Sequence, residues 1–391
     1  MAAVDRLREE IAAIAAIDHH AHLLLAPGAR TRLIDVLTES GDPVQVEQVR
    51  ELPASHRALH DLGEVLGGIA PGEVEAVCAA ARASDPAAHA RRLLGACGFA
   101  AMYVDDGYRV DGMVSLDEHA ALVRCAVRRV LRIETEAEAA SAGRPSFEEC
   151  RDTFRNAVAN AVAAGAVALK TIAAYRCGLD LPAPDPAQAG AAYDAWRRSG
   201  DRRLRAAELI SVFVADALEA AGPGVPLQVH TGLGDADAHL LAADPALLQA
   251  HIDGGMLAGV PVVLLHCYPY VRNAGYLASL YANVHFDLSL AITLMPHRGA
   301  DLIGEALELA PATKLLFATD ASRLPEAFFL GARWWREALA AALGRLVDDG
   351  FADDARALRH AEMILAGNAR RLYRDPASPP RITGAGSAAA T

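Results

Sequence analysis

The sequence lacks the markers of several protein classes, and each absence narrows the possible functions. Its six cysteines lie far apart, with no C-x-x-C pair, so neither a zinc ribbon nor a disulfide scaffold is indicated. A reducing, cytoplasmic setting is therefore expected. The 37 basic residues are outnumbered by 49 acidic ones, which gives a net charge of −12. Because phosphate contacts need a basic face, and none stands out, we expect no nucleic-acid partner.

Long apolar runs are also missing. The longest charge-free stretch, residues 256–271, contains Pro261, His266 and Pro269 and falls short of the ~20 residues that a membrane-spanning helix needs. The first ten residues mix both signs of charge before any apolar stretch, unlike a signal peptide. We therefore expect a soluble protein with no membrane partner. Hydrophobic residues make up 53% of the chain, which is enough for a large core.

The sequence does contain short apolar runs of strand length, separated by longer Ala- and Leu-rich segments of helical character. Most runs are continuously hydrophobic, as is typical of parallel strands buried on both faces. We predict strands at residues 14–17, 100–104, 130–133, 166–172, 226–229, 262–265, 284–290 and 314–318. We predict helices at residues 147–163, 202–221, 245–252, 299–309 and 330–346, and a last one near 353–373.

Eight strands alternating with helices predict an α/β fold, namely a (β/α)8 TIM barrel. An open doubly wound sheet is the alternative that the same alternation allows. The interval 23–94 is too long for one crossover, so we expect a helical insertion after strand 1. Residues 1–375 are predicted to form one metal-dependent barrel domain. The Pro-, Gly- and Ala-rich tail, residues 376–391, is predicted to be disordered.

Polar residues interrupt the ends of these strands, beginning with Asp18-His19-His20-Ala21-His22. Residues two apart on a strand point to the same side, so His20 and His22 can present both imidazoles to one point. Because the chain has 14 histidines, this pair alone is weak evidence.

Four later strand ends carry one more ionisable residue each: Lys170, His230, His266 and Asp320. In a barrel these ends surround the catalytic mouth. Each residue by itself is explained as well by an ordinary capping or core role, but the repetition at successive strand ends argues against that explanation. Imidazoles and carboxylates that converge in a partly apolar cup suit a divalent transition metal. A lysine can join them only when neutral, or as a carbamate formed with carbon dioxide.

This order of residues resembles the metal motif of the amidohydrolase superfamily of barrel hydrolases. Several segments further resemble the amidohydrolase-related branch, which includes the domain fused to glutamine-synthetase-like proteins in fungi and plants. These segments are VLRIET (130–135), LKTIAAYRCGLD (169–180), PLQVHTGLGD (226–235), AGYLA (274–278) and GNARRLY (367–373). The resemblance extends over residues 14–373 and is weakest across the expected helical insertion.

The resemblance implies a metal centre with one or two divalent ions, most commonly Zn²⁺. His20 and His22 would hold the first ion with Asp320, and His230 and His266 the second, with a carboxylated Lys170 as the bridge. Where members of the branch keep one ion, the lysine position meets the substrate instead.

The implied reaction is metal-assisted hydrolysis of a carbon–nitrogen bond. Asp320 and His266 are the expected catalytic residues, with Asp320 taking the proton of the activated water. The expected substrate is a small, carboxylate-bearing amide, for which a γ-glutamyl amide is the analogy that the branch offers. Two alternatives stay open: a metal-dependent decarboxylase of the same superfamily, and a barrel that has lost catalysis and acts as a binding partner.

Contacts to the substrate are less determined by the sequence. Tyr175 and Arg176 follow Lys170 in a loop expected to rim the mouth, where Arg176 would pair with a substrate carboxylate. A surface arginine explains Arg176 equally well. Asp18 is either a hydrogen-bond partner of a ligand imidazole or a turn cap. The oligomeric state is left open, with a homo-oligomer as one outcome.

Charged residues also stand at the ends of the second and third predicted strands. Arg132 and Glu134 would share one face, where they form either an internal ion pair or a substrate contact. Asp105 and Asp106 come after the second strand, and one of them is expected to face the cup.

Overall fold

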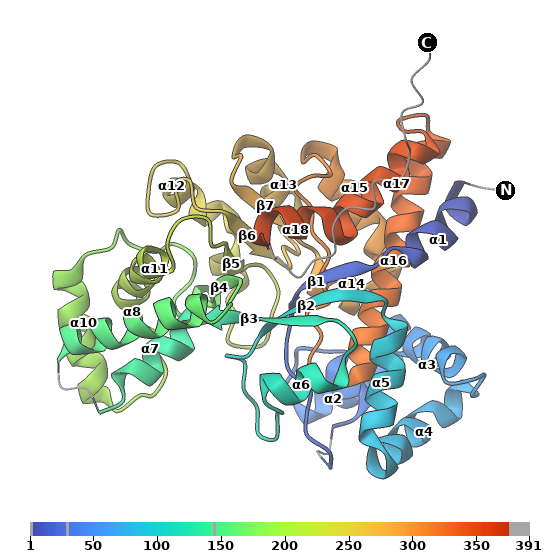
Figure 1. The fold of residues 1–391 in the computed structure, drawn as a ribbon, viewed down its shortest axis with the longest axis horizontal. Helices are drawn as coiled ribbons and strands as arrows, with labels where there is room; N and C mark the ends of the chain where they lie inside the picture. The colour runs from blue at the N-terminus through green and yellow to red at the C-terminus, as the bar shows by residue number, and fades with distance from the viewer. Residues whose placement is uncertain (1–2, 29–30, 144–145, 375–391) are drawn as a thin grey trace.

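Seven parallel strands form the centre of the protein, in a computed structural model that describes residues 3–28, 31–143 and 146–374. The strands follow one another in chain order around a single curled sheet, with helices outside it (Figure 1). They are β1 (Ala16–Ala21), β2 (Phe99–Asp105), β3 (Ala126–Arg132), β4 (Ala168–Thr171), β5 (Leu227–His230), β6 (Val262–Leu265) and β7 (Val284–Phe286). Strands β1 and β4 to β7 are buried at every position, as the continuous apolar runs predict.

The prediction of a regular eighth strand at 314–318 is wrong for the described chain. Leu315 forms a single parallel bridge with Phe286 of β7. On the other side, the N–H of His19 donates to the Phe317 carbonyl over 3.3 Å, and the N–H of Asp320 to the His20 carbonyl over 3.0 Å. This segment therefore links the two edges of the curled sheet. Its backbone hydrogen bonds are isolated and do not form a continuous ladder. The positive φ of Asp320 (54°) then ends its extended conformation.

The predicted strand 284–290 also ends early, at Phe286. The carboxylate of Asp287 accepts the N–H of Ser289 over 2.9 Å, and helix α14 (Ser289–Leu294) begins at that point. An acceptor side chain at this place competes with the sheet ladder and starts a helix instead.

Helices cover the sheet, and several match the predicted ranges closely. From β2 onward they are α6 (Leu116–Leu122), α7 (Ile133–Ser141), α8 (Phe147–Ala163), α9 (Ala173–Arg176), α10 (Pro186–Ser199), α11 (Ala207–Ala221), α12 (Gln249–Ile252), α13 (Val271–Leu280), α14, α15 (Gly299–Leu309), α16 (Pro325–Asp348), α17 (Asp354–Glu362) and α18 (Asn368–Tyr373). Short 3-10 helices are η3 (Leu240–Ala243), η4 (Pro245–Leu248) and η5 (Pro296–Arg298), and a π-helical turn, η6 (Met363–Gly367), joins α17 to α18.

The chain is also helical before β1 and between β1 and β2. Helix α1 (Ala3–Ala13) precedes the sheet and packs on α16. Between β1 and β2 lie η1 (Leu33–Val36), α2 (Pro43–Gln48), η2 (Val49–Glu51), α3 (Pro53–Val65), α4 (Pro71–Ser84) and α5 (Pro86–Ala96). Helices α3 and α5 pack against α16 at the lower right of Figure 1, with α4 packed on both of them.

A small apolar core fills the inside of the curled sheet. It contains Ile17, Tyr103, Val130 and Leu265 from the strands, and Tyr373 from α18. This packing fills the interior with side chains. The polar residues of the strands lie at their carboxyl ends, outside this small core. The described residues include no helix that is long and apolar enough to cross a membrane. The predicted tail, residues 376–391, lies outside the described residues.

Candidate metal centre

The six residues predicted as metal ligands meet at the carboxyl ends of the strands. Oδ1 of Asp320 lies 3.2 Å from Nε2 of His20 and 3.2 Å from Nε2 of His22. Oδ2 of Asp320 lies 3.7 Å from Nδ1 of His266, whose ring centroid is 4.5 Å from that of His230. The ammonium nitrogen of Lys170 is 3.2 Å from Nε2 of His20. Residues from five separate places along the chain thus converge on one buried point.

The imidazole of His20 is held in one tautomer by Gln228. The amide nitrogen of Gln228 donates to the His19 carbonyl over 2.8 Å and to the Tyr373 hydroxyl over 2.9 Å. Its oxygen therefore faces His20, whose Nδ1 lies 2.8 Å away and must be the donor. The other ring nitrogen, Nε2, is left with its lone pair directed at Asp320.

Two further imidazoles of the cluster donate to backbone carbonyls. Nδ1 of His22 donates to the carbonyl of Asp105 over 3.1 Å, which leaves Nε2 as the lone-pair nitrogen. Nε2 of His230 donates to the carbonyl of Leu233 over 3.1 Å, which leaves Nδ1 free. A carbonyl only accepts hydrogen bonds, so each contact fixes the position of the ring proton.

The fourth imidazole is fixed by a serine. The Ser289 hydroxyl donates to Asp287 over 2.8 Å, so it accepts from Nδ1 of His266, also over 2.8 Å. Nε2 of His266 is therefore the lone-pair nitrogen. Each of the four histidines donates through one nitrogen and keeps the other unprotonated, which is how histidines bind metals.

Burial keeps three of these histidines, His20, His230 and His266, neutral near neutral pH. Burial, with the positive charge of Lys170, lowers the pKa of His20 to about 3. Burial also holds the pKa of His230 well below its usual value and lowers that of His266. Neutral imidazole is the form that coordinates a metal ion, so the local electrostatics favour ligation.

The donor set is able to hold a cation. Oδ1 of Asp320 is buried and has no hydrogen-bond partner among the described residues, although two imidazole nitrogens lie 3.2 Å away. Those nitrogens carry lone pairs, so neither donates to Oδ1, and the ammonium of Lys170 lies 3.2 Å from Nε2 of His20 rather than on Oδ1. An unpaired buried anion of this kind is costly. A divalent ion fits this set, because imidazole nitrogen and carboxylate oxygen are the donors that Zn²⁺ accepts.

Lys170 is 1% exposed and lies among charged groups of both signs. Burial lowers the pKa of its amine to about 8. A larger share of the side chain is therefore neutral near pH 7 to 8 than for an ordinary lysine, and only the neutral amine reacts with carbon dioxide.

The backbone is strained at both residues predicted to be catalytic. His266 has φ 68° and Asp320 has φ 54°, a left-handed conformation that non-glycine residues seldom adopt. Such strain costs on the order of 1–3 kcal/mol per residue and is concentrated at functional sites. The left-handed conformation turns the chain sharply at His266, after β6, and at Asp320, after the segment that follows β7. These turns direct both side chains toward the cluster.

Tyr175 is placed beside the cluster, whereas Arg176 is engaged elsewhere. The ring of Tyr175 lies over His230, with centroids 4.2 Å apart, and its hydroxyl packs on Gly234 so closely that a Cβ there would come within 2.2 Å of it. Arg176 pairs with Glu138 of α7 over 3.2 Å, and its side chain is only 6% exposed. The reading of Arg176 as a surface residue is therefore wrong. Its predicted contact with a substrate carboxylate stays a prediction.

The remaining acidic candidates are structural links. Asp18 accepts the N–H and the hydroxyl of Thr319 over 3.0 and 2.6 Å, and so ties β1 to the segment after β7. Asp105 forms a buried ion pair with Arg132, and Asp106 pairs with Arg129. The pairing partner of Arg132 is thus on the second strand rather than at Glu134.

Glu134 has a different role. It lies in the first turn of α7. Its carboxylate accepts the N–H of Ile172 over 3.0 Å and the hydroxyl of Thr171. It therefore positions the loop that follows Lys170.

Sequence reasoning missed Gln228, Ser289, Tyr108 and Glu39. Gln228 stands two residues before His230, and a glutamine inside an otherwise apolar strand is a signal that was present. The ring of Tyr108 lies 5.0 Å from that of His22. Burial and the negative charge of Asp320 raise the pKa of Glu39 to about 8. Tyr108 and Glu39 lie in irregular segments, where no periodicity marks a residue as part of the site.

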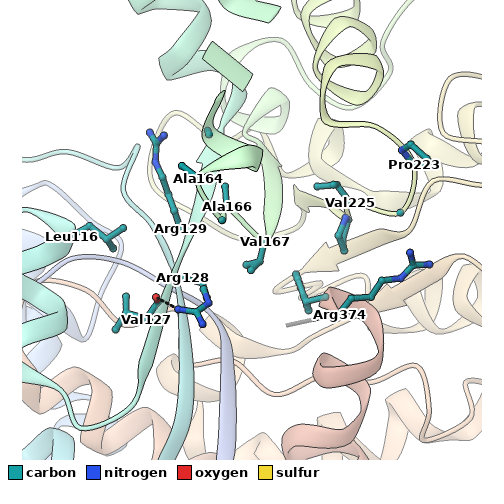
Figure 2. Close-up of a pocket in the computed structure, with 15 residues that line it drawn as sticks. Leu116, Val127, Arg128, Arg129, Ala164, Ala166, Val167, Pro223, Val225 and Arg374 are labelled. Atoms are coloured by element: carbon teal, nitrogen blue, oxygen red, sulfur yellow. Dashed lines mark hydrogen bonds between the residues drawn. The ribbon is translucent and has the colours of Figure 1, made fainter. Parts of the chain in front are cut away.

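A separate cavity of about 680 Å³ lies at the opposite end of the strands (Figure 2). It is lined by residues at the starts of β3 to β5, including Val127 and Val167, and by Arg374 after α18. Arg128 donates to the carbonyl of Val127 there over 3.2 Å. In barrels this end of the strands serves stability, and the convergent imidazoles lie at the other end.

Comparison with known proteins gives a consistent result. A family model described as amidohydrolase matches residues 17–374. Protein fluG of Emericella nidulans is 29% identical over 422 residues, covering 97% of this chain and 48% of fluG, so the chain spans about half the length of that relative.

Solved structures with the same fold are also known. A crystal structure from Lactobacillus casei ATCC 334, provisionally described as a metal-dependent hydrolase, is 34% identical with a TM-score of 0.85, covering 94% of this chain and 97% of that one. Uronate isomerase from Thermotoga maritima is 13% identical with a TM-score of 0.68, covering 95% and 97% of the two chains, and shares the fold.

Proposed function

The chain belongs to the amidohydrolase family and is a metal-dependent hydrolase, and from this premise we propose that it cleaves the amide bond of a small, carboxylate-bearing substrate. The observation that carries the proposal is the set of four imidazoles that each donate through one nitrogen and keep the other unprotonated. In His20 and His22 the unprotonated nitrogen lies 3.2 Å from Oδ1 of Asp320, which has no hydrogen-bond partner in the described part of the chain.

His20 and His22 would hold a first ion together with Asp320. His230 and His266 would hold a second, with Lys170 as a bridging carbamate. A divalent ion of the zinc type, once bound, makes water acidic enough to give hydroxide near pH 7 and polarises the scissile carbonyl. The residues of the chain then have to orient the substrate and move protons.

Asp320 is the base in this proposal. Its carboxylate oxygens face the buried cluster, so Oδ2 can accept the proton of the attacking water and pass it to the departing amine nitrogen. Transfer to the amine is needed because an amide anion is a poor leaving group. His266 is held by Ser289 at a fixed angle beside Asp320 and so helps to fix the direction of that carboxylate.

A γ-glutamyl amide is the first substrate class to test. The class comes from the branch resemblance, in which such domains are fused to glutamine-synthetase-like proteins. Charges of both signs near the cluster support it: Asp320, Asp235 and Arg323 all act on the buried carboxyl group of Glu39. A substrate head that carries both an ammonium and a carboxylate matches such a mixture.

The test is to incubate the metal-loaded protein with a panel of γ-glutamyl amides and of simple N-acyl amino acids, and to measure amine and carbon dioxide separately. We expect amine release in step with loss of the amide. Release of carbon dioxide without amine would instead establish the decarboxylase, and neither product with any carboxylate-bearing amide would reject the proposed substrate class. The His22→Asn protein serves as the metal-site control.

A further inference from the structure

A second group of metal-binding side chains lies outside the barrel cluster, where α4, α5 and α16 meet. Cys78 is in the middle of α4, His89 is in α5, and Glu326 is in the first turn of α16. The three side chains are almost fully buried, with exposed fractions of 1%, 5% and 0%. One donor atom from each lies within 4.8 Å of the others.

The carboxylate of Glu326 is only half satisfied. Oε1 accepts from Nε2 of His89 over 3.0 Å and from the guanidinium of Arg82. Oε2 is buried and has no hydrogen-bond partner within residues 3–28, 31–143 and 146–374. An unpaired buried carboxylate oxygen is costly, and native proteins seldom leave one without a reason.

We propose that Cys78, His89 and Glu326 form a structural binding site for a divalent cation of the zinc type, separate from the barrel centre. Thiolate, imidazole and carboxylate are the three kinds of side chain that Zn²⁺ binds, at about 2.0 to 2.3 Å. Ligand atoms that are each within 4.8 Å of one another need small movements to surround such an ion. Carboxylate oxygens alone would instead favour Ca²⁺ or Mg²⁺.

A small cavity lies near the cluster, although Cys78, His89 and Glu326 are not among its lining residues. It measures about 90 Å³ and is lined by Arg82, Pro86, Ala90 and Pro325, which are close in sequence to the three proposed ligands. A volume of this size holds a water molecule. Arg82 is 20% exposed at its side chain and lines this cavity, so it can leave Glu326 when a cation arrives.

The charges change in a defined way on binding. Without a cation, burial and the negative charge of Glu326 raise the pKa of Cys78 to about 12, so the thiol keeps its proton. This also makes Cys78 a poor nucleophile for a Cys–His catalytic pair. A bound divalent ion takes the thiolate form and releases that proton, and His89 shifts its proton to the other ring nitrogen.

The site would fasten the helices between β1 and β2 to the body of the protein. Cys78 and His89 come from two of those helices, and Glu326 begins α16 six residues after Asp320. A cation there links α4 and α5 to α16 and adds its binding free energy to the stability of the fold. Its contribution is to stability and not to the chemical step.

Cobalt provides a test that separates this site from the barrel centre. The proposed ligands of the barrel cluster are nitrogen and oxygen donors, so a thiolate-to-cobalt charge-transfer band in the near ultraviolet reports a cysteine ligand outside that set, and the comparison with Cys78→Ser assigns it to Cys78. The full chain is stripped with a chelator, reloaded with Co²⁺ under reducing conditions, and compared with the Cys78→Ser and Cys97→Ser proteins. Cys97 is a matched control, because it is also a buried thiol in the same region.

We expect the band in the wild-type and Cys97→Ser proteins and its loss in Cys78→Ser, together with a loss of one metal ion per chain by elemental analysis. His22→Asn, which alters the barrel cluster, should retain the band. A Co²⁺-loaded wild type without the band, or a band that survives Cys78→Ser, overturns the proposal. If Cys78→Ser fails to fold, His89→Gln replaces it, and the wild-type spectrum alone remains decisive.

Discussion

Nδ1 of His20 lies 2.8 Å from Oε1 of Gln228, and this contact is one end of a buried chain of polar contacts that runs to His266. The chain passes from His20 through Gln228, Tyr373, His19, Asp287 and Ser289 to His266, and its links are hydrogen bonds except for the 2.9 Å ion-pair contact between Nε2 of His19 and Oδ2 of Asp287. Two imidazoles of the cluster are therefore oriented by one connected network, because each member fixes the proton position of the next.

Replacing Gln228 by leucine should weaken metal binding in the barrel. The variant removes the acceptor that holds the Nδ1 proton of His20, so Nε2 is no longer kept free for a metal ion. We expect a fall in affinity of about 10- to 100-fold, as for other partners of ligating histidines. Competition with a chromophoric chelator measures this, with Gln188→Leu on the exposed start of α10 as the control. Equal affinity in wild type and Gln228→Leu would refute the role.

The position of the metal cluster followed from the sequence because strand ends are marked by local signals. A continuous apolar run fixes where a parallel strand lies, and a polar residue directly after it marks the carboxyl end. His230, His266 and Asp320 each stand at such a junction, so topology alone brings them together. Tyr373, whose hydroxyl accepts from Gln228 in this chain of contacts, comes from the last helix and has no such local signal.

Two errors have physical causes that local sequence does not record. Residues 314–318 are as apolar as the true strands, but their backbone makes scattered hydrogen bonds to β7 and β1 rather than a ladder. A surface position explained Arg176 as well as a substrate contact did, because it follows Lys170 in a predicted loop. The short helix α9 turns its side chain toward Glu138 of α7 instead, and tertiary packing decides that direction.

Asp320→Asn should abolish turnover and leave the metal content largely intact. Asparagine keeps the shape and one neutral oxygen for the ion, but it cannot accept the proton of the attacking water. General-base catalysis contributes about 10²- to 10⁴-fold in rate, so kcat should fall by at least that range. Turnover with the best amide, paired with elemental analysis of the same sample, checks both parts. Full activity in a metal-loaded Asp320→Asn protein would reject Asp320 as the base.

Lys170 should carry a carbamate, and the barrel should hold two ions. The amine, with its pKa lowered by burial to about 8, reacts with carbon dioxide near neutral pH, and the product bears two oxygens for two ions. Metal is best counted in the Cys78→Ser background, so that only barrel ions are measured. Labelled bicarbonate should give a carbamate signal in wild type and none in Lys170→Met. One barrel ion per chain, with a free amine at Lys170, would reject the bridging carbamate.

A buried histidine outside the cluster should make the protein less stable in acid. His119 of α6 is fully buried, and its Nδ1 accepts the N–H of Leu24 over 3.3 Å. Burial lowers its pKa from 6.5 to about 4. Between these values the unfolded chain binds more protons than the folded one, so the free energy of unfolding falls as pH falls from 6.5 to 4. The stabilisation is complete above pH 6.5, and about 3 kcal/mol of it disappears in acid.

His119→Asn isolates this contribution. Its side-chain oxygen can still accept from Leu24, so the variant removes the titration while it keeps an acceptor in place. Some stability is lost at every pH because asparagine fills less of the space packed against Phe328. The decisive quantity is the slope: urea unfolding should depend on pH less steeply in His119→Asn than in wild type between about pH 6.5 and 4. The exposed His56→Asn protein should keep the wild-type slope. Parallel slopes for wild type and His119→Asn would mean that His119 takes up its proton without unfolding the site, and would remove it as the cause of acid sensitivity.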